Sequence, residues 1–413
     1  MKRRTFLKGL AALGAVGAVP LARYWPEDGW VNPCADPGLS PEILAHPGVR
    51  AALDGLDFAK VWDMHTHLTG LGDGNSGIWV NPRMDQLYHP IEYAQKAFYM
   101  NAACAAGGPG STDDNFVARV GKLADGFPSG YKLLLFAFER YYTPAGKPVP
   151  ELTQFHVPNR YAAQVAASNP GRFEWAASVH PYRPDWRDEL DMSLRHGARA
   201  VKWLPPSMGI DPGDARCDPF YAYLAGANLP LITHAGEEMA AKGADQQDFG
   251  NPLRLRRALD HGVRVVVAHC ASLGAGVDLD KGPHAGEAEN FSLFARLMGE
   301  QRYAKLLFGD ISAVTQINRA GYIKPLLERE EWHARLLNGS DYPLPGILPL
   351  FSPKRIAAEG LLAEGLVPVL SEIRNRNPLL FDLVLKRSLA WQGRGFPAQV
   401  FETRAFFATA AGS

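Results

Sequence analysis

Short apolar runs recur along the chain at intervals that suit buried strands. The first, Phe58–Trp62, leads directly into Asp63-Met64-His65-Thr66-His67, where the first strand is expected to end. Runs that are apolar on both faces are typical of strands in a covered parallel sheet. Seven further strands are therefore expected, over Tyr131–Phe138, Glu174–Val179, Ala198–Leu204, Leu229–Thr233, Val263–Ala268, Lys305–Gly309 and Arg335–Asn338.

Between these runs lie stretches whose apolar residues recur at helical spacing. Ser111 and Thr112 are candidates to cap one such helix, because their side-chain oxygens can accept a free backbone N–H. A short helix is also expected over Pro41–Leu56. The tail after Pro353, which is helical and apolar in places such as Leu379–Leu389, is expected to pack on the outside of the barrel. The helices expected between the strands are Asp85–Ala106, Asp113–Ala124, Arg160–Ser168, Arg187–His196, Asn251–Asp260 and Ala288–Glu300.

Strand and helix thus alternate eight times, which predicts an α/β fold of the (β/α)8 or TIM-type barrel kind, with right-handed crossovers. The barrel is expected to occupy residues 57–413, extra C-terminal helices included. An irregular lead-in rich in Pro, Gly, Asp and Trp precedes it at residues 23–56. An open doubly wound sheet is the alternative, and no Gly-rich dinucleotide fingerprint follows the first strand to favour it.

Residues 1–22 have the features of an export signal. A charged segment, Lys2–Lys8, precedes the weakly apolar segment Gly9–Val19, and the pair Arg3-Arg4 resembles a twin-arginine signal. A membrane anchor is the alternative, but the apolar run is shorter than the ~20 residues that a spanning helix needs. We therefore expect a periplasmic or otherwise exported protein that is a partner of the twin-arginine export machinery, a route that carries folded proteins.

The composition narrows the range of partners. Of the 413 residues, 46% are hydrophobic and 21% charged, and 43 basic residues balance 43 acidic ones. This balance offers no basic surface for nucleic acid or an anionic membrane. Export would permit disulfides, but spacing does not say which cysteines pair, and a homo-oligomer stays open. The chain has no CxxC pair, so a structural zinc knuckle is not expected. Its four cysteines are Cys34, Cys104, Cys217 and Cys270.

The polar residues with the clearest chemistry stand at the ends of the expected strands. His65 and His67 are two positions apart, so they point to the same face of the first strand, where both imidazoles can reach one metal ion. Active sites of TIM barrels lie at the carboxyl ends of the strands, so the set predicts one metal site, against the alternative of separate hydrogen-bonded core residues. The later strands end at Lys202, His234, His269 and Asp341.

This order of HxH on strand one, His on strands five and six, and Asp on strand eight resembles the amidohydrolase superfamily, closest to its amidohydrolase-related branch, over residues 61–345. The resemblance implies that His65, His67 and Asp341 bind a divalent metal, with His234 as a further ligand. It implies that His269 binds a second metal or polarises the substrate, which makes Asp341 and His269 the candidate catalytic residues. Imidazole with carboxylate suits Zn²⁺, with Mn, Fe or Ni as alternatives.

Lys202 matches a strand-four position at which some members of that superfamily carry a carboxylated lysine that bridges two metals. Carboxylation needs a neutral amine, and burial near cations lowers the pKa of a lysine. A salt bridge or a clamp for an anionic substrate are the alternatives, so one metal or two stays open. A bound Zn²⁺ can lower the pKa of water to about 7, and Asp341 stands where a carboxylate could take up the proton.

Other residues are weaker candidates for substrate contacts. His180 ends strand three with Arg183 after it, and the two could bind substrate, with a hydrogen-bonded loop histidine as the alternative for His180. Asp310 ends strand seven and could hydrogen-bond substrate or a ligand. Glu237 and Glu238 follow His234 and could contact substrate or support the ligands from behind. Cys270 is expected to pack away from the barrel interior, and three aromatic residues could wall the pocket or belong to the core: Trp79, Trp203 and Tyr342.

These observations predict an exported metal-dependent hydrolase that cleaves an amide, lactone or ester-type bond of a small molecule. A metal-dependent decarboxylase or hydratase, both lyases of the same branch, is the first alternative. A non-catalytic periplasmic binding protein is the second, and it would be expected to lack one or more of the ligands.

Overall fold

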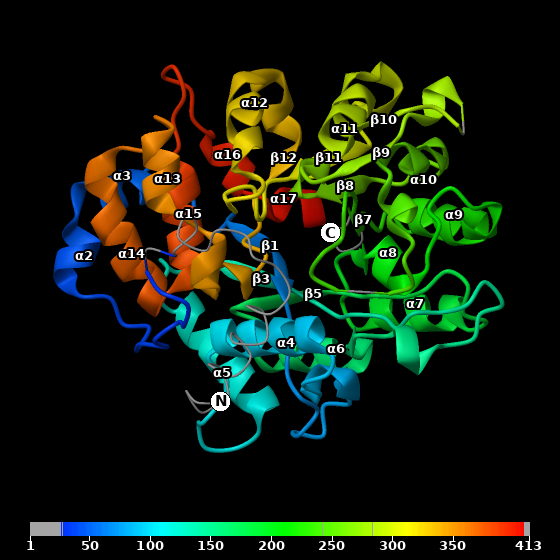
Figure 1. The fold of residues 1–413 in the computed structure, drawn as a ribbon, viewed down its shortest axis with the longest axis horizontal. Helices are drawn as coiled ribbons and strands as arrows, with labels where there is room; N and C mark the ends of the chain where they lie inside the picture. Colours follow the sequence, from blue (N-terminus) through cyan, green and yellow to red (C-terminus); the bar gives the residue numbers. More distant parts are fainter. Residues whose placement is uncertain (1–25, 27, 242, 283, 409–413) are drawn as a thin grey trace.

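A barrel of parallel strands forms the centre of the molecule (Figure 1). The computed structural model describes residues 26, 28–241, 243–282 and 284–408. The predicted signal at residues 1–22 falls outside this range. Within it, the barrel strands are β1 (Trp62–His67), β3 (Lys132–Phe136), β5 (Phe173–Ala176), β6 (Val201–Trp203), β7 (Leu231–His234), β8 (Val265–Ala268), β11 (Leu307–Asp310) and β12 (Leu336–Leu337).

Two arcs of strands close on each other to complete the barrel. One arc has the order β1-β3-β5 and the other β12-β11-β8-β7-β6, and all of these pairs are parallel. A parallel bridge between Ala177 and Val201 joins the arcs on one side, and one between Thr66 and Tyr342 joins them on the other. Closure confirms the predicted TIM-type barrel and excludes the open doubly wound sheet.

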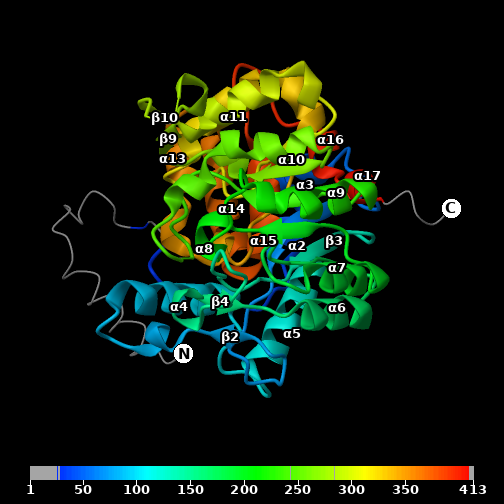
Figure 2. The same cartoon turned by 90° about the vertical axis from the view of Figure 1, so that its right-hand side faces the viewer.

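Helices surround the strands, as the two perpendicular views show (Figures 1 and 2). Ser111 caps α5 as predicted, because its Oγ accepts the N–H of Asp114 at 3.0 Å. The predicted helix Asn251–Asp260 is instead a 3-10 turn followed by a short α-helix. The helices between barrel strands are α4 (Pro90–Ala103), α5 (Thr112–Ala124), α6 (Asn159–Ser168), α7 (Trp186–Arg195), α8 (Pro205–Met208), α9 (Asp218–Gly226), α10 (Arg256–Asp260), α11 (Asn290–Gly299) and α12 (Ile323–Glu328).

The first strand begins at Trp62, the last residue of the apolar run from which it was predicted. Asp57 accepts the N–H of Ala59 with its side chain and that of Lys60 with its carbonyl, which makes a turn of the segment expected to be strand. Two antiparallel pairs were not predicted, since strands of two or three residues carry no readable alternation. They are β2 (Trp79–Val80) with β4 (Phe155–His156), and β9 (Ala275–Val277) with β10 (Glu287–Glu289).

The interior of the barrel is filled from below by the end of the chain. The ring of Phe407 in α17 (Arg404–Phe407) stacks on Trp62 at 6.1 Å, and Phe406 meets Phe308 edge-on at 4.7 Å. The prediction that the whole tail packs outside was therefore wrong for this last helix. It holds for α13 (Pro353–Ala358), α14 (Val367–Arg376), α15 (Pro378–Ser388) and α16 (Ala398–Phe401), which flank the barrel (Figure 1).

The lead-in packs beside these C-terminal helices (Figure 1). The helix expected over Pro41–Leu56 is split into α2 (Pro41–Ala45) and α3 (Pro47–Leu53), because Pro47 cannot continue a helix from the preceding turn. The domain boundaries at residues 22 and 56 stay predictions. Across the described residues, the helices are all too short or too polar to span a membrane.

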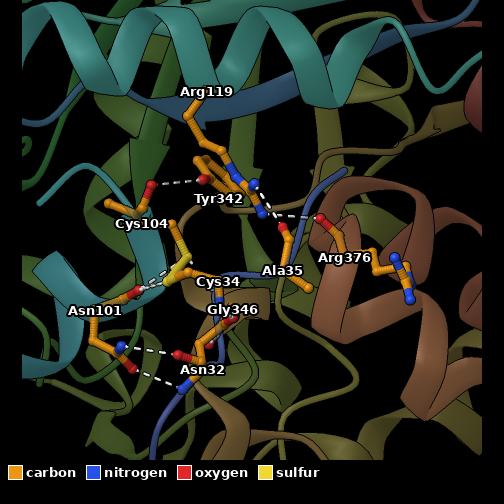
Figure 3. Close-up of a disulfide and its surroundings, with 10 residues drawn as sticks. Asn32, Cys34, Ala35, Asn101, Cys104, Arg119, Tyr342, Gly346 and Arg376 are labelled. Atoms are coloured by element: carbon orange, nitrogen blue, oxygen red, sulfur yellow. Dashed lines mark hydrogen bonds between the residues drawn. A yellow bond between two sulfur atoms is a disulfide. The ribbon is translucent and has the colours of Figure 1, made fainter. Parts of the chain in front are cut away.

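A disulfide ties the lead-in to α4 (Figure 3). It joins Cys34 to Cys104, and around it Asn32 and Asn101 exchange two hydrogen bonds, of 2.8 and 3.2 Å. The amide of Asn32 also donates to the carbonyl of Gly346 at 3.0 Å, just beyond the last barrel strand. The lead-in thereby fastens α4 to the loop that follows β12.

Replacing both cysteines by serine (Cys34→Ser, Cys104→Ser) should lower the free energy of unfolding. The crosslink closes a loop with a sequence separation of 70 residues, for which chain entropy predicts a loss of about 4 kcal/mol. Denaturant unfolding of the purified protein measures it. A thiol reductant should lower the stability of the natural protein to that of the variant and leave the variant unchanged; a natural protein indifferent to reductant would contradict the prediction.

Candidate metal centre

A pocket opens at the carboxyl ends of the barrel strands and contains the residues singled out in the sequence. It encloses about 810 Å³, its open mouth included. Six predicted residues line it: His65, His67, Lys202, His234, His269 and Asp341. The other lining residues are Leu68, Thr69, Gly70, Ile78, Tyr99, Phe138, Phe155, Val157, Leu204, Glu238, Ala240, Ala241, Pro343 and Leu344.

A β-bulge turns the first strand so that its histidines face inward. The register of β1 against β3 shifts between Asp63 and Thr66, where Met64 and His65 together lie opposite one residue of β3. Met64 belongs to the core inside the barrel and His65 to the pocket, so both point inward. Without the extra residue, His65 would share the face of Asp63 and point away from the site. Beyond the bulge, alternation brings His67 inward as well.

Three imidazoles converge on the carboxylate of Asp341. Its Oδ1 lies 3.2 Å from Nε2 of His65 and 3.1 Å from Nε2 of His67, and its Oδ2 lies 3.6 Å from Nε2 of His269. Burial alone would raise the pKa of Asp341, but the surrounding imidazoles and Lys202 hold it well below its usual range. Donor atoms of His65, His67 and Asp341 all lie within 4.8 Å of one another.

The opposite nitrogens of two of these rings are held by Asp310 and Ser312. Nδ1 of His65 lies 2.5 Å from Oδ2 of Asp310, and Nδ1 of His269 lies 3.0 Å from the carbonyl oxygen of Ser312. The Ser312 hydroxyl lies between the two rings, 3.0 and 2.8 Å from these nitrogens. Asp310 therefore orients a ring of the centre from behind, and of the two roles expected for it, a bond to substrate or a bond to a ligand, the structure shows the second.

These hydrogen bonds fix the tautomer of each ring. A carbonyl oxygen can only accept, so Nδ1 of His269 donates its proton and Nε2 carries the lone pair. Burial lowers the pKa values of His65 and His269 well below that of a free imidazole, which keeps both rings neutral. Lone pairs of neutral imidazoles therefore face a carboxylate, an electron-rich arrangement that fits a cation at its centre.

Lys202 enters the same space from β6. Its Nζ lies 3.3 Å from Nε2 of His65, and the ring of Phe136 lies 5.0 Å below the ammonium group. The side chain is fully buried. Burial lowers its pKa to about 8, although nearby carboxylates, Asp341 first among them, work in the opposite direction.

His234 lines the pocket but faces a different set of partners. Its Nδ1 lies 3.3 Å from Oε2 of Glu238, and its Nε2 lies 3.3 Å from the carbonyl oxygen of Glu237. Its ring centre is 5.6 Å from that of His269. The side chain of Glu238 thus supports His234 from behind, whereas Glu237 contributes its backbone, and its side chain is not part of the lining.

Two weaker candidates lie outside the pocket. Nε2 of His180 donates to the carbonyl of Met208 at 3.0 Å, and its Nδ1 accepts the N–H of Tyr182 at 3.1 Å, so both ring nitrogens serve the fold. Burial lowers the pKa of His180 to about 3, so the ring is neutral. Arg183 is paired with Glu139 at 2.8 Å and lines a separate cavity.

The proposed aromatic walls are also placed elsewhere. On β6 the inward position belongs to Lys202, so alternation sends Trp203 outward, where its indole N–H donates to the carbonyl of Val179. Tyr342 is buried against α4, and Trp79 does not line the pocket. Cys270 packs in the outer core as predicted. The aromatic lining comes from Tyr99, Phe138 and Phe155, which no strand-end rule singled out.

Behind Asp341 lies a buried clamp that sequence reasoning missed. Lys386 of α15 donates to the carbonyl of Gly339 at 2.7 Å and pairs with Asp382 at 2.7 Å. Asp63 accepts the N–H of Ser340 at 2.8 Å. A Cβ at position 339 would lie 2.4 Å from that of His65, so only glycine permits this approach. Charged residues at the spacing of Asp382 and Lys386 in an apolar helix were the available signal.

A barrel whose strand ends gather imidazoles around one carboxylate is the architecture of metal-dependent TIM-barrel enzymes. The chain belongs to the amidohydrolase family: residues 62–346 match the family model described as amidohydrolase. Residues 1–20 match the signal sequence of the twin-arginine translocation pathway, so the protein is exported by that route. No curated protein matched the sequence.

Several solved structures are similar at low identity. An uncharacterized TIM-barrel protein from Bordetella bronchiseptica is 17% identical, with 69% of this chain and 86% of that chain covered and a TM-score of 0.43. A putative 2-pyrone-4,6-dicarboxylic acid hydrolase from Pseudomonas putida is 16% identical over 84% and 97%, with a TM-score of 0.41. A manganese-bound 5-carboxyvanillate decarboxylase from Novosphingobium aromaticivorans is 14% identical over 78% and 94%, also at 0.41.

Replacing the clamp lysine (Lys386→Met) should lower the free energy of unfolding by about 3 kcal/mol, because it leaves buried carboxyls without their cation. It should also weaken binding of Zn²⁺ by about tenfold, since the loop that presents Asp341 loses its anchor. Denaturant unfolding and competition with a chelator measure the two effects.

The double variant Lys386→Met with Asp382→Asn separates the loss of stability from the loss of Zn²⁺ binding. Removing both charges should recover much of the lost stability but leave metal binding weak, because Gly339 still lacks its donor. Natural Zn²⁺ affinity in both variants would show that the clamp does not position Asp341.

Proposed function

We propose that this protein is a metal-dependent hydrolase that acts, after export, on an amide, lactone or ester-type bond. The observation that carries the proposal is the convergence of His65, His67 and His269 on the carboxylate of Asp341. Membership of the amidohydrolase family supports an enzyme of this superfamily, and the donor set is the reason to assign it hydrolysis.

A divalent metal fits the residues that are present. His65, His67 and Asp341 would hold it, with His269 at the edge of the same group, because their lone pairs and charge meet in one buried space. Zn²⁺ suits this mixture of imidazole and carboxylate, and Mn, Fe or Ni are alternatives. When bound, such an ion supplies the Lewis acidity that polarises a carbonyl and acidifies water.

The chain's own groups then have separate tasks. The Asp341 carboxylate accepts a proton from the attacking water at Oδ and returns it to the leaving group, which a carboxylate within hydrogen-bond reach can do. Asp310 and Ser312 hold the rings of His65 and His269 so that their Nε2 atoms stay directed at the site. The apolar walls keep bulk water away from the reacting bond and strengthen these electrostatic interactions.

The chemical state of Lys202 distinguishes a centre with one metal ion from a centre with two. As a carboxylated lysine it would bridge a second ion, with His234 and His269 as the nearby imidazoles, and a dinuclear site suits hydrolysis. Its position 3.3 Å from Nε2 of His65 places it close enough to contribute to the same centre. The amine is buried, which favours the neutral form that carboxylation requires.

A lyase, a decarboxylase or hydratase, is the second candidate, and Lys202 is also the observation that favours it. An unmodified ammonium group at the base of the pocket would hold the carboxylate of an anionic substrate. Metal content and the intact mass of the exported protein distinguish the two. Two ions per chain with Lys202 heavier by one CO₂ support the hydrolase, one ion with an unmodified lysine supports the lyase, and no ion would overturn both.

The variants His65→Ala and Asp341→Asn should lose turnover and bind Zn²⁺ at least about a hundredfold more weakly, because each removes a donor from the converging group. Metal content after dialysis and activity on a substrate found by screening amides, lactones and esters measure this. His196→Ala is the control, since the side chain of this exposed residue bonds the carbonyl of Met192 in the helix that it caps. Circular dichroism should be the same for all three, and retained turnover in either site variant with metal added would refute the assignment.

A further inference from the structure

We propose that the substrate of this pocket carries an uncharged, apolar group next to the bond that reacts, and that the wall of the pocket rejects anionic substrates. The proposal rests on the hydrolase function argued above and names the class of its substrate. It follows from a division of the lining. Polar and charged groups gather at the base of the pocket, around Asp341 and Lys202, and apolar side chains form the wall above it.

The wall above the base is almost wholly apolar. The segments just beyond β3 and β4 build it, where Phe138 and Val157 are paired by an antiparallel bridge. Ile78 and Phe155 extend this surface from the β2–β4 pair, and Leu204 continues it from the end of β6. A substrate in contact with these side chains is favoured in proportion to the apolar area that it buries.

Two polar side chains in the wall, those of Glu238 and Tyr99, are already bonded within the protein. Oε1 of Glu238 accepts the N–H groups of Ala240 and Ala241 at 2.6 and 2.9 Å, and its other oxygen faces His234. The hydroxyl of Tyr99 donates to the carbonyl of Ala240 at 2.7 Å. A charged group placed here would lose its hydration without finding a partner, which is costly.

Among the lining residues that the structure describes, positive charge is confined to the base. Lys202 has the only basic side chain of this set besides the imidazoles, and the set contains no arginine. Arg319 is buried outside the lining, where it donates to the hydroxyl of Ser272 at 3.3 Å. A second carboxylate on a substrate would therefore meet no cation along the wall.

Two exposed apolar side chains stand next to lining residues in the sequence. Leu71 is 39% exposed and follows Gly70 of the lining, and Met239 is 60% exposed and stands between the lining residues Glu238 and Ala240. Methionine adapts its shape to varied apolar partners. The path from the metal centre to the mouth thus suits a chain or ring of variable length, which the wall and then the rim cover.

Isothermal titration of the zinc-loaded protein tests this without requiring turnover. Straight-chain alkanamides of increasing length should bind with an affinity that rises about fourfold for each methylene until the chain reaches the mouth. Alkanedioates of matching length should bind at least about tenfold more weakly. Dioates that bind as tightly as the amides, or amides whose affinity does not depend on length, would overturn the proposal.

A positive charge placed in the wall should reverse the preference for alkanamides over alkanedioates. Phe155→Arg should weaken the amides and strengthen the dioates, each by about tenfold, because the half-buried position 155 faces the pocket. Leu44→Arg is the control, since Leu44 of α2 is 44% exposed and does not line the pocket. If Phe155→Arg does not fold, Leu344→Arg carries the same test from another half-buried lining position.

The two proposals fail in different ways. Length-dependent binding of amides without hydrolysis of any ester, lactone or amide would overturn the hydrolase and leave the apolar substrate class standing. Hydrolysis accompanied by equal binding of dioates and amides would overturn the substrate class alone. An unchanged preference in both folded wall variants would also count against it.

Discussion

Two hydrogen bonds on the outer sides of the histidine rings determine what the centre of this barrel can hold. The carboxylate of Asp310 accepts a hydrogen bond from Nδ1 of His65, and the backbone carbonyl of Ser312 accepts one from Nδ1 of His269. The lone pairs are thereby left on the nitrogens that face Asp341. Without this constraint the rings could turn a proton toward the carboxylate and neutralise the site by hydrogen bonding alone. With it, the arrangement fits the divalent cation that we propose for this centre.

The supporting structure for this constraint comes from parts of the chain that are far from the pocket. The bulge in β1 moves His65 to the inner face, and Asp63, left on the outer face, bonds the segment that leads to Asp341. Lys386 holds the residue before that segment from a helix beyond the barrel. The lead-in and its disulfide fasten α4, whose Tyr99 reaches over the pocket. Helices outside the barrel thus contribute directly to the geometry at its mouth.

The sequence was sufficient to predict the barrel and the strand ends that meet in one pocket, because buried parallel strands leave short apolar runs and TIM barrels place their sites at one rim. It could not predict the bulge, which changes the face of a residue without changing the pattern. His180 also follows a predicted strand, yet its ring bonds the backbone of neighbouring loops. The pairing of Cys34 with Cys104, the role of Ser312 and the apolar wall all depend on contacts between segments distant in the sequence, for which a single sequence carries no signal.

The stacking of Phe407 on Trp62 has a consequence for how the protein is made. Trp62 and Phe407 stand 345 positions apart in the sequence, so the contact at the lower end of the first barrel strand cannot form until the whole stretch between them has been made. A chain translocated unfolded would have to complete this part of the core outside the cytoplasm. A pathway that transports finished, folded proteins removes this difficulty, and the signal at residues 1–20 directs the chain to that pathway.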